Sequence, residues 1–168
     1  RIPVGKKIYW SKFGPTFKSP SGEFYAIRFA AGMDIRAAEQ WYQMNKASNK
    51  EEFLTAVKMN ALCRFNIIYA DKTGNIGFID DGMIPQRDNS LDWTLPLRGD
   101  TSLYLWKTWL PTDSMPQVHN PNCGWVYNTN NTPYQATCDE ENIPVGTFHD
   151  NMGFRKGMNN RAERFKTL

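Results

Sequence analysis

The chain has 168 residues, of which 40% are hydrophobic and 22% charged, and its formal net charge is +3. These values are ordinary for a soluble globular protein, and the length is sufficient to bury a core. The small net charge, without a run of Lys and Arg interleaved with aromatic residues, argues against a nucleic-acid partner. No stretch approaches the roughly 18 apolar residues needed to cross a bilayer, so we expect no membrane partner either.

The first thirty residues alternate extended runs with turn signals. Residues 7–10 and 24–29 predict strands, because they are rich in aromatic and β-branched side chains. Between them lie two turn signals, Gly14-Pro15 and the Ser-Pro-Ser-Gly segment at 19–22.

Two helices are predicted next, as an antiparallel hairpin lying over a sheet. Asp34 is expected to cap the first helix, and Ser48 with Glu51 forms an S-x-x-E capping box for the second. The spacing of apolar residues indicates which positions face inward. They are Ile35, Ala38, Trp41, Tyr42 and Met44 in the first helix, and Phe53, Leu54, Val57 and Ala61 in the second.

Two strands at 64–70 and 75–79 then flank a turn at 71–74, whose sequence is Asp-Lys-Thr-Gly. Residues 80–121 predict an irregular segment rich in Pro, Asp, Trp and Thr. A segment of that length packs by its own side chains or forms a functional surface. A short apolar strand is expected at 124–127.

That strand leads into the Asn loop, a run of carboxamide and Thr side chains at residues 128–133 that ends in Thr132-Pro133. Asn tolerates left-handed backbone and competes for local hydrogen bonds, so the run predicts a turn. A polar turn at the end of a strand is a common place for a functional site. An Asn-rich hairpin turn without a function is the alternative.

Three cysteines lack the paired spacing of a structural zinc site, so no metal is expected. Cys123 and Cys138 flank the Asn loop at a separation of 138 − 123 = 15 residues. An oxidising compartment would allow them to pair, whereas in a reducing one they would be two small buried residues. Cys63 is expected in the core, and no cysteine-protease signature is present.

Several separated motifs follow one another in a recognisable order: YADKTGNIGF at 69–78, LPLRG at 95–99, LP at 110–111, MPQVHNP at 115–121 and NNTP at 130–133. Together they resemble the penicillin acylase family of amidases. The segment KFGPT at 12–16 is similar to the "HGP" turn of that family, with Phe13 where His is usual. The resemblance covers nearly the whole chain and is strongest from about Phe65 to Pro133.

The resemblance implies an N-terminal nucleophile hydrolase. In such enzymes a serine exposed by autocatalytic cleavage attacks an amide carbonyl, and its own α-amine is the base. By position in the NNTP motif, Asn130 is the side chain that donates to the oxyanion. Arg161, in a segment similar to the helix start "R-x-x-R-[IF]" of the family, would orient it, although a surface Arg is the alternative. The interval before this Arg is longer than usual in the family, so Arg155 and Arg164 remain candidates.

Two aromatic residues match apolar positions that line the acyl pocket in relatives, namely Trp41 and Phe65; either is equally well explained as core. The resemblance implies a small acyl amide as substrate, such as a penicillin or an N-acyl homoserine lactone, and a periplasmic or extracellular location. It implies no cofactor, although relatives often carry a structural calcium whose carboxylates are not convincingly present here.

The resemblance also implies a fold, an α+β chain forming part of an αββα sandwich. Residues 1–168 would be a single segment of a larger catalytic domain, with the rest of the same precursor as partner. Because the chain starts at Arg1 with neither an initiator Met nor a signal segment, we expect the nucleophilic serine upstream and no activity from the segment alone.

Two other functions remain open. Trp93, Tyr104, Trp106, Trp109, Trp125 and Tyr127 would suit the aromatic platform of a non-catalytic sugar- or peptide-binding module. That hypothesis predicts several coplanar, exposed rings. A catalytically degenerate acylase homologue is the other possibility.

Overall fold

The computed structural model describes residue 5 and residues 7–168. Within that range the chain is a mixed α+β structure with two three-stranded antiparallel sheets and three α-helices. The expected α+β class is therefore confirmed. None of the helices in this range combines the length and the apolar character that a membrane crossing requires.

The first sheet is a meander of β1 (Tyr9–Ser11), β2 (Gly14–Lys18) and β3 (Phe24–Ala26). The predicted strands at 7–10 and 24–29 are found in shortened form, but Gly14-Pro15 opens the middle strand and does not form the expected turn. Gly14 has a φ of +127°, and a Cβ on it would lie 2.3 Å from the Ile27 carbonyl oxygen. The close approach of β2 to the end of β3 therefore requires glycine at this position.

The predicted helical hairpin consists of α1 (Ala37–Lys46) and α2 (Lys50–Val57). The expected inward face of α1 is confirmed for Met44, which packs against the core, but it is wrong for Ile35, Trp41 and Tyr42, which are exposed. Gln40 is the buried residue of α1. Its Nε2 donates to the Val57 carbonyl (3.1 Å), and its Oε1 accepts from the backbone N–H groups of Ala61 (2.6 Å) and Leu62 (3.0 Å). Burial of a carboxamide is favourable here because these backbone groups need partners.

The N-terminal caps also differ from the prediction. The residue before α1 is Arg36, and the Asp34 carboxylate binds its backbone and guanidinium instead of capping the helix. The capping box of α2 is shifted by one residue, because Asn49 accepts from the N–H of Glu52 (2.9 Å) and the Glu52 carboxylate accepts from the N–H of Ser48 (2.8 Å). The inward face predicted for α2 is confirmed, with Phe53 and Val57 in the core.

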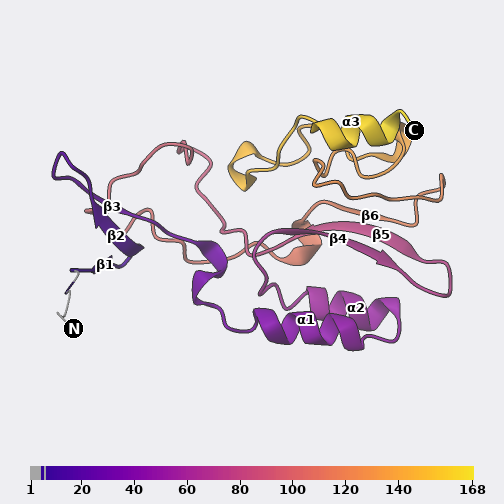
Figure 1. Cartoon of the computed structure of the whole chain (residues 1–168), viewed down its shortest axis with the longest axis horizontal. Coiled ribbons are helices and arrows are strands. Elements are labelled where there is room, and N and C mark those ends of the chain that lie inside the picture. Colours follow the sequence, from indigo (N-terminus) through magenta and orange to yellow (C-terminus); the bar gives the residue numbers. More distant parts are fainter. Residues whose placement is uncertain (1–4, 6) are drawn as a thin grey trace.

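The second sheet has the order β4-β5-β6, with β4 at Phe65–Ala70, β5 at Ile76–Asp81 and β6 at Gln117–His119. Figure 1 shows α1 and α2 along one side of this sheet and α3 (Asn160–Lys166) on the other. Ile67 and Ile79 pack against α2, whereas Phe78 and Val118 pack against the segment that contains Ala136. The alternation of strand side chains thus gives the sheet two apolar faces.

The turn between β4 and β5 is held by one carboxylate. Asp71 accepts from the backbone N–H and hydroxyl of Thr73 (2.8 and 2.6 Å) and from the backbone and side-chain N–H groups of Asn75 (3.1 and 2.9 Å). These hydrogen bonds, that from the Thr73 hydroxyl above all, lower the pKa of the Asp71 carboxyl below its ordinary value.

Residues 82–116 are largely irregular, as expected, and pack through their own side chains, but the prediction of an irregular segment at 80–121 is wrong at its ends, where β5 extends to Asp81 and β6 spans Gln117–His119. Ile84 and Met115 form a core cluster with Tyr134 and Phe154. The predicted strand at 124–127 is absent: Gly124 has a left-handed φ of +78°, and the N–H of Tyr127 donates to the Ala136 carbonyl (3.0 Å) outside any sheet. The 3₁₀ helices are η1 (Ala30–Met33), η2 (Thr112–Ser114), η3 (Asp139–Glu141) and η4 (Asp150–Met152).

Candidate functional site

The Asn loop lies between β4 and the start of α3. From β4, the side-chain amide of Asn66 donates to the Asn131 carbonyl (3.0 Å) and to Asn128 Oδ1 (3.2 Å). From the other side, the amide of Asn159 donates to the carbonyls of Thr129 (3.1 Å) and Asn130 (2.9 Å). The loop is therefore attached to two separate elements of the fold.

Asn130 itself has a left-handed backbone with a φ of +57°. Non-glycine residues adopt this conformation at an energetic cost, and surrounding interactions have to maintain it. Asn128 Oδ1 supplies one of these by accepting from the N–H of Asn130 (2.8 Å). The predicted turn is confirmed.

The guanidinium of Arg161 donates from Nη2 to Oδ1 of Asn130 across 31 residues of sequence. A guanidinium has only donors, so this contact requires the carbonyl oxygen of the carboxamide to face Arg161 and the Nδ2 amide to face away. No residue among 5 and 7–168 accepts a hydrogen bond from Asn130 Nδ2. The amide is thus free to donate to another molecule.

Asn130 borders a cleft with a volume of about 480 Å³. Phe65 lines the same cleft, and the ring of Trp41 lies edge-on to Phe65 with the centroids 6.1 Å apart. Both rings are partly exposed, at 49% for Trp41 and 43% for Phe65, so neither is a core residue. The structure thus places Phe65 in the same cleft as Asn130, whereas Trp41 does not line the cleft and is connected to it only through its contact with Phe65.

Of the three candidate arginines, only Arg161 contacts the Asn130 side chain. Arg155 lines the cleft without forming an ion pair in the described part of the chain. Arg164 lies one turn further along α3 and has no side-chain hydrogen bond to the described residues. Of the three arginines that the sequence left as candidates, Arg161 is therefore the one that binds the Asn130 side chain.

An ion pair between the buried Asp80 and the solvent-accessible Arg64 forms another wall of the cleft. Arg64 donates to both carboxylate oxygens of Asp80 (2.9 and 2.8 Å) and to the Gly153 carbonyl (2.7 Å), and its guanidinium lies 4.3 Å from the centre of the Phe154 ring. Asp80 is only 2% exposed. A bidentate pair of this kind fixes both side chains, and here it attaches residues 153–154 to the end of the second sheet.

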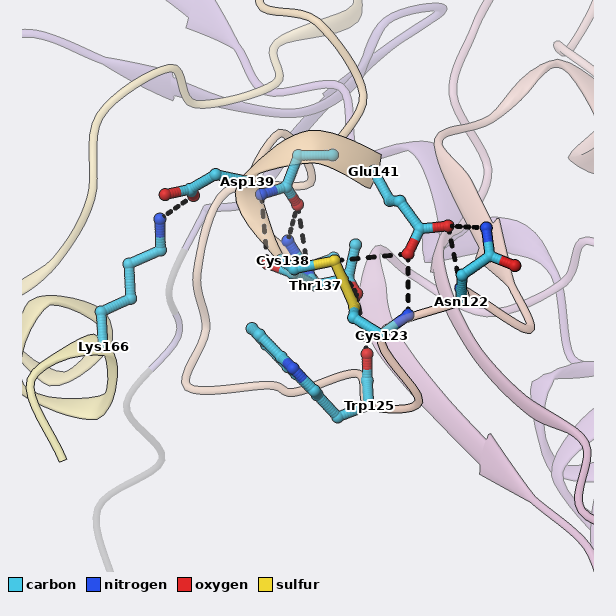
Figure 2. Close-up of a disulfide and its surroundings, with 10 residues drawn as sticks. Asn122, Cys123, Trp125, Thr137, Cys138, Asp139, Glu141 and Lys166 are labelled. Carbon is cyan, nitrogen blue, oxygen red and sulfur yellow. Dashed lines mark hydrogen bonds and ion pairs between the residues drawn. A yellow bond between two sulfur atoms is a disulfide. The ribbon is translucent and has the colours of Figure 1, made fainter.

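The disulfide between Cys123 and Cys138 closes the segment that contains the Asn loop (Figure 2). Glu141 lies beside it and accepts from the backbone N–H groups of Asn122 (2.8 Å) and Cys123 (2.9 Å), which lowers the pKa of its carboxyl. The Cys123, Cys138 and Glu141 ligand atoms lie within 4.8 Å of one another. With the sulfurs joined, neither is available as a metal-binding thiolate.

The helix that carries Arg161 is held by the same segment. Lys166 pairs with Asp139 next to the disulfide (Figure 2), and the Phe165 ring stacks on Tyr127 with the centroids 4.4 Å apart and the planes 7° apart. Burial raises the pKa of the Tyr127 hydroxyl, so this residue acts as a neutral packing surface.

The ring geometry does not support the hypothesis of an aromatic binding platform. Trp93, Tyr104 and Trp106 do line a hollow of about 660 Å³ beside the first sheet. However, the expected coplanar arrangement is wrong: the ring planes of Trp93 and Tyr104 are 89° apart and those of Trp106 and Trp109 are 72° apart. Tyr127 is only 5% exposed. Such rings do not present a continuous stacking surface.

Sequence reasoning missed Asn66, Asn159 and the Arg64–Asp80 pair. A polar residue at the second position of an otherwise apolar strand, as in Phe65-Asn66-Ile67, is the signal that identifies Asn66. Asn159 stands at the N-terminal cap of α3, where its Oδ1 accepts from the N–H of Ala162 (3.0 Å). Asn is a preferred cap, but its second contact to the Asn loop depends on tertiary structure.

The model of the family described as "Penicillin amidase" matches residues 2–168. The chain belongs to the penicillin amidase family. Penicillin G acylase of Escherichia coli is 36% identical over 102 residues, covering 61% of this chain and 12% of the relative. An acyl-homoserine lactone acylase of Pseudomonas fluorescens (strain Pf0-1) is 28% identical over 91 residues, 50% of this chain and 12% of that protein.

The solved structures agree with this assignment. This penicillin amidase family chain matches a thermostable penicillin G acylase from Alcaligenes faecalis with a TM-score of 0.65 and 30% sequence identity. The match covers 85% of this chain and 26% of that one. The chain therefore corresponds to a small part of the acylases that it resembles, and the resemblance inferred from its motifs is confirmed.

Proposed function

We propose that residues 1–168 are one segment of the catalytic domain of an amidohydrolase and contribute the oxyanion donor of its active site. The observation that supports this most directly is the geometry of Asn130. Its carbonyl oxygen is engaged by Arg161, its Nδ2 amide is free, and it borders a cleft beside Phe65. This is the arrangement that a side-chain oxyanion donor requires.

The reaction would be hydrolysis of a linear acyl amide. A serine hydroxyl supplied from outside these residues attacks the amide carbon, and the serine α-amine takes the hydroxyl proton. Such an amine has a pKa near 8, so about a tenth of it is unprotonated at neutral pH, and the pKa is close enough to that pH for the amine to act as the base. The carbonyl oxygen becomes negative in the tetrahedral intermediate and is stabilised by Asn130 Nδ2. Collapse expels the amine with the returned proton, and water then releases the acyl group.

The part of the cleft beside Phe65 would receive the acyl group. Phe65, supported by Trp41, offers an aromatic wall next to the donor, which suits a hydrophobic acyl chain. Penicillins and N-acyl homoserine lactones are the substrate classes that we propose, because similar proteins are named as penicillin and acyl-homoserine lactone acylases. A periplasmic or extracellular location is part of the proposal, and the Cys123–Cys138 disulfide supports it.

The fold proposed for the complete domain is an αββα sandwich. The second sheet with α1 and α2 on one side would be part of one helical and one sheet layer. We propose that the remainder of the precursor supplies the other layers and the nucleophile. The 168-residue chain alone is then expected to be inactive, and amide hydrolysis by the purified chain would overturn this scheme.

The deciding experiment is Asn130→Ala in the complete acylase. Removal of one oxyanion donor typically lowers turnover by about 10²- to 10³-fold, and we expect that loss with the fold unchanged. Asn160→Ala is the matched control, since Asn160 is exposed and its side chain has no hydrogen bond to the described residues. Near-normal turnover of the Asn130 variant would reject the proposed role.

A further inference from the structure

Asn159 connects the Asn loop to α3 through a single carboxamide. Its Nδ2 donates to the backbone carbonyls of Thr129 (3.1 Å) and Asn130 (2.9 Å), and its Oδ1 accepts from the N–H of Ala162 (3.0 Å). The donor end therefore holds the loop while the acceptor end caps the helix. Asn is one of the few residues with both a donor and an acceptor at the required reach.

The two carbonyls that Asn159 holds lie on either side of Asn130. They belong to the peptide units before and after this residue, so their positions determine the left-handed backbone of Asn130 and hence the direction of its side chain. A strained conformation of this kind persists only where surrounding groups maintain it. On the other side the N–H of Asn130 is bound by Asn128.

Arg161 follows Asn159 by two residues in the same helical turn. The position of Asn159 relative to the Asn loop thus also sets the position of the guanidinium relative to Asn130 Oδ1. One residue fixes both the backbone of the donor and the group that orients its carboxamide. An N-cap without a role in the site would need only the contact to Ala162.

We propose that Asn159 is a positioning residue for the oxyanion donor, an inference that rests on the proposed role of Asn130. Asn159 would contact neither the substrate nor the reacting atoms. It would maintain the direction of the Asn130 amide, so its loss would affect the transition state, in which negative charge develops, more than the binding of the neutral amide.

Asn159→Asp separates this role from helix capping. Asp is as good an N-cap as Asn, and its negative charge is favourable at a helix start. However, the new carboxylate oxygen cannot donate and repels the carbonyls of Thr129 and Asn130. Asn160→Asp is the control, because it adds the same charge one residue further along without touching the Asn loop.

The experiment is steady-state hydrolysis of a chromogenic acyl anilide by the complete acylase. We expect Asn159→Asp to lower kcat at least about tenfold with KM changed less than about twofold, and Asn160→Asp to leave both near their original values. In an Asn130→Ala background, Asn159→Asp should cause no further loss. Asn159→Ser, which retains a capping oxygen but is too short to reach the carbonyls, should reproduce the effect if the Asp variant does not fold.

The outcomes distinguish the two proposals. Normal kcat for Asn159→Asp together with a severe loss for Asn130→Ala would overturn the positioning role and leave the oxyanion role intact. A further drop of Asn159→Asp in the Asn130→Ala background would also overturn it, because the residue would then act elsewhere. Normal turnover of Asn130→Ala would remove the function on which the inference rests.

Discussion

The contact between Arg161 and Asn130 makes a quantitative prediction about catalysis. We consider Arg161→Met, which removes the guanidinium but keeps an unbranched side chain of similar helix propensity. Without the guanidinium, nothing in the described structure requires the carboxamide to keep its oxygen toward α3. Part of the population would then present the oxygen to the cleft and repel the developing oxyanion.

The size of the effect follows from the kind of hydrogen bond that is lost. A hydrogen bond with one charged partner contributes about 1.5–3 kcal/mol, and each 1.36 kcal/mol corresponds to about tenfold in rate. Because the Arg161 side chain is exposed to solvent, we expect the lower part of this range. The predicted loss of kcat is about 10- to 30-fold, smaller than the loss predicted for Asn130→Ala.

The assay is hydrolysis of an acyl amide by the complete acylase, with kcat and KM determined separately. Arg164→Met is the matched control, since it makes the same change three residues later in α3 without a contact to Asn130. Equal kcat values for the Arg161 and Arg164 variants, in an enzyme that Asn130→Ala disables, would show that the guanidinium does not orient the donor.

Three further predictions concern stability. Gln40→Met should lower the free energy of unfolding by about 3 kcal/mol or more, because two buried N–H groups and a carbonyl lose their partner. The control is Gln43→Met at an exposed position of the same helix. Equal free energies of unfolding for the two variants in urea would contradict the prediction. Replacement of Cys123 and Cys138 by Ser should cost about 3 kcal/mol, as expected for closure of a loop of 15 residues, and an unchanged urea midpoint would argue against it. The pKa of Asp71 is lowered in the folded chain, so its charged carboxyl stabilises the fold above the ordinary carboxyl pKa, and this stabilisation is lost as the pH falls toward the folded-state pKa. Asp71→Asn removes this titrating group and should therefore lose less unfolding free energy between neutral pH and about pH 3 than the parent chain. Parallel pH profiles of the two proteins would contradict this prediction.

The local elements of this chain were largely determined by short-range sequence patterns. The β4–β5 hairpin follows from two apolar runs around Asp71-Lys72-Thr73-Gly74, and the inward face of α2 follows from its helical periodicity. The ordered motifs were enough to identify the penicillin amidase family, and the position of Asn130 in one of them singled out that residue.

Tertiary structure decided what local patterns do not encode. In α1 the apolar periodicity predicted the burial of Trp41 and Tyr42, which are exposed, and not that of Gln40, whose side chain binds backbone groups of Val57, Ala61 and Leu62. The choice of Arg161 over Arg155, and the attachment of the Asn loop by Asn66 and Asn159, likewise depend on how distant segments meet. Hydrogen bonds between residues far apart in sequence have no periodic signature, so these contacts became visible only when the chain was folded.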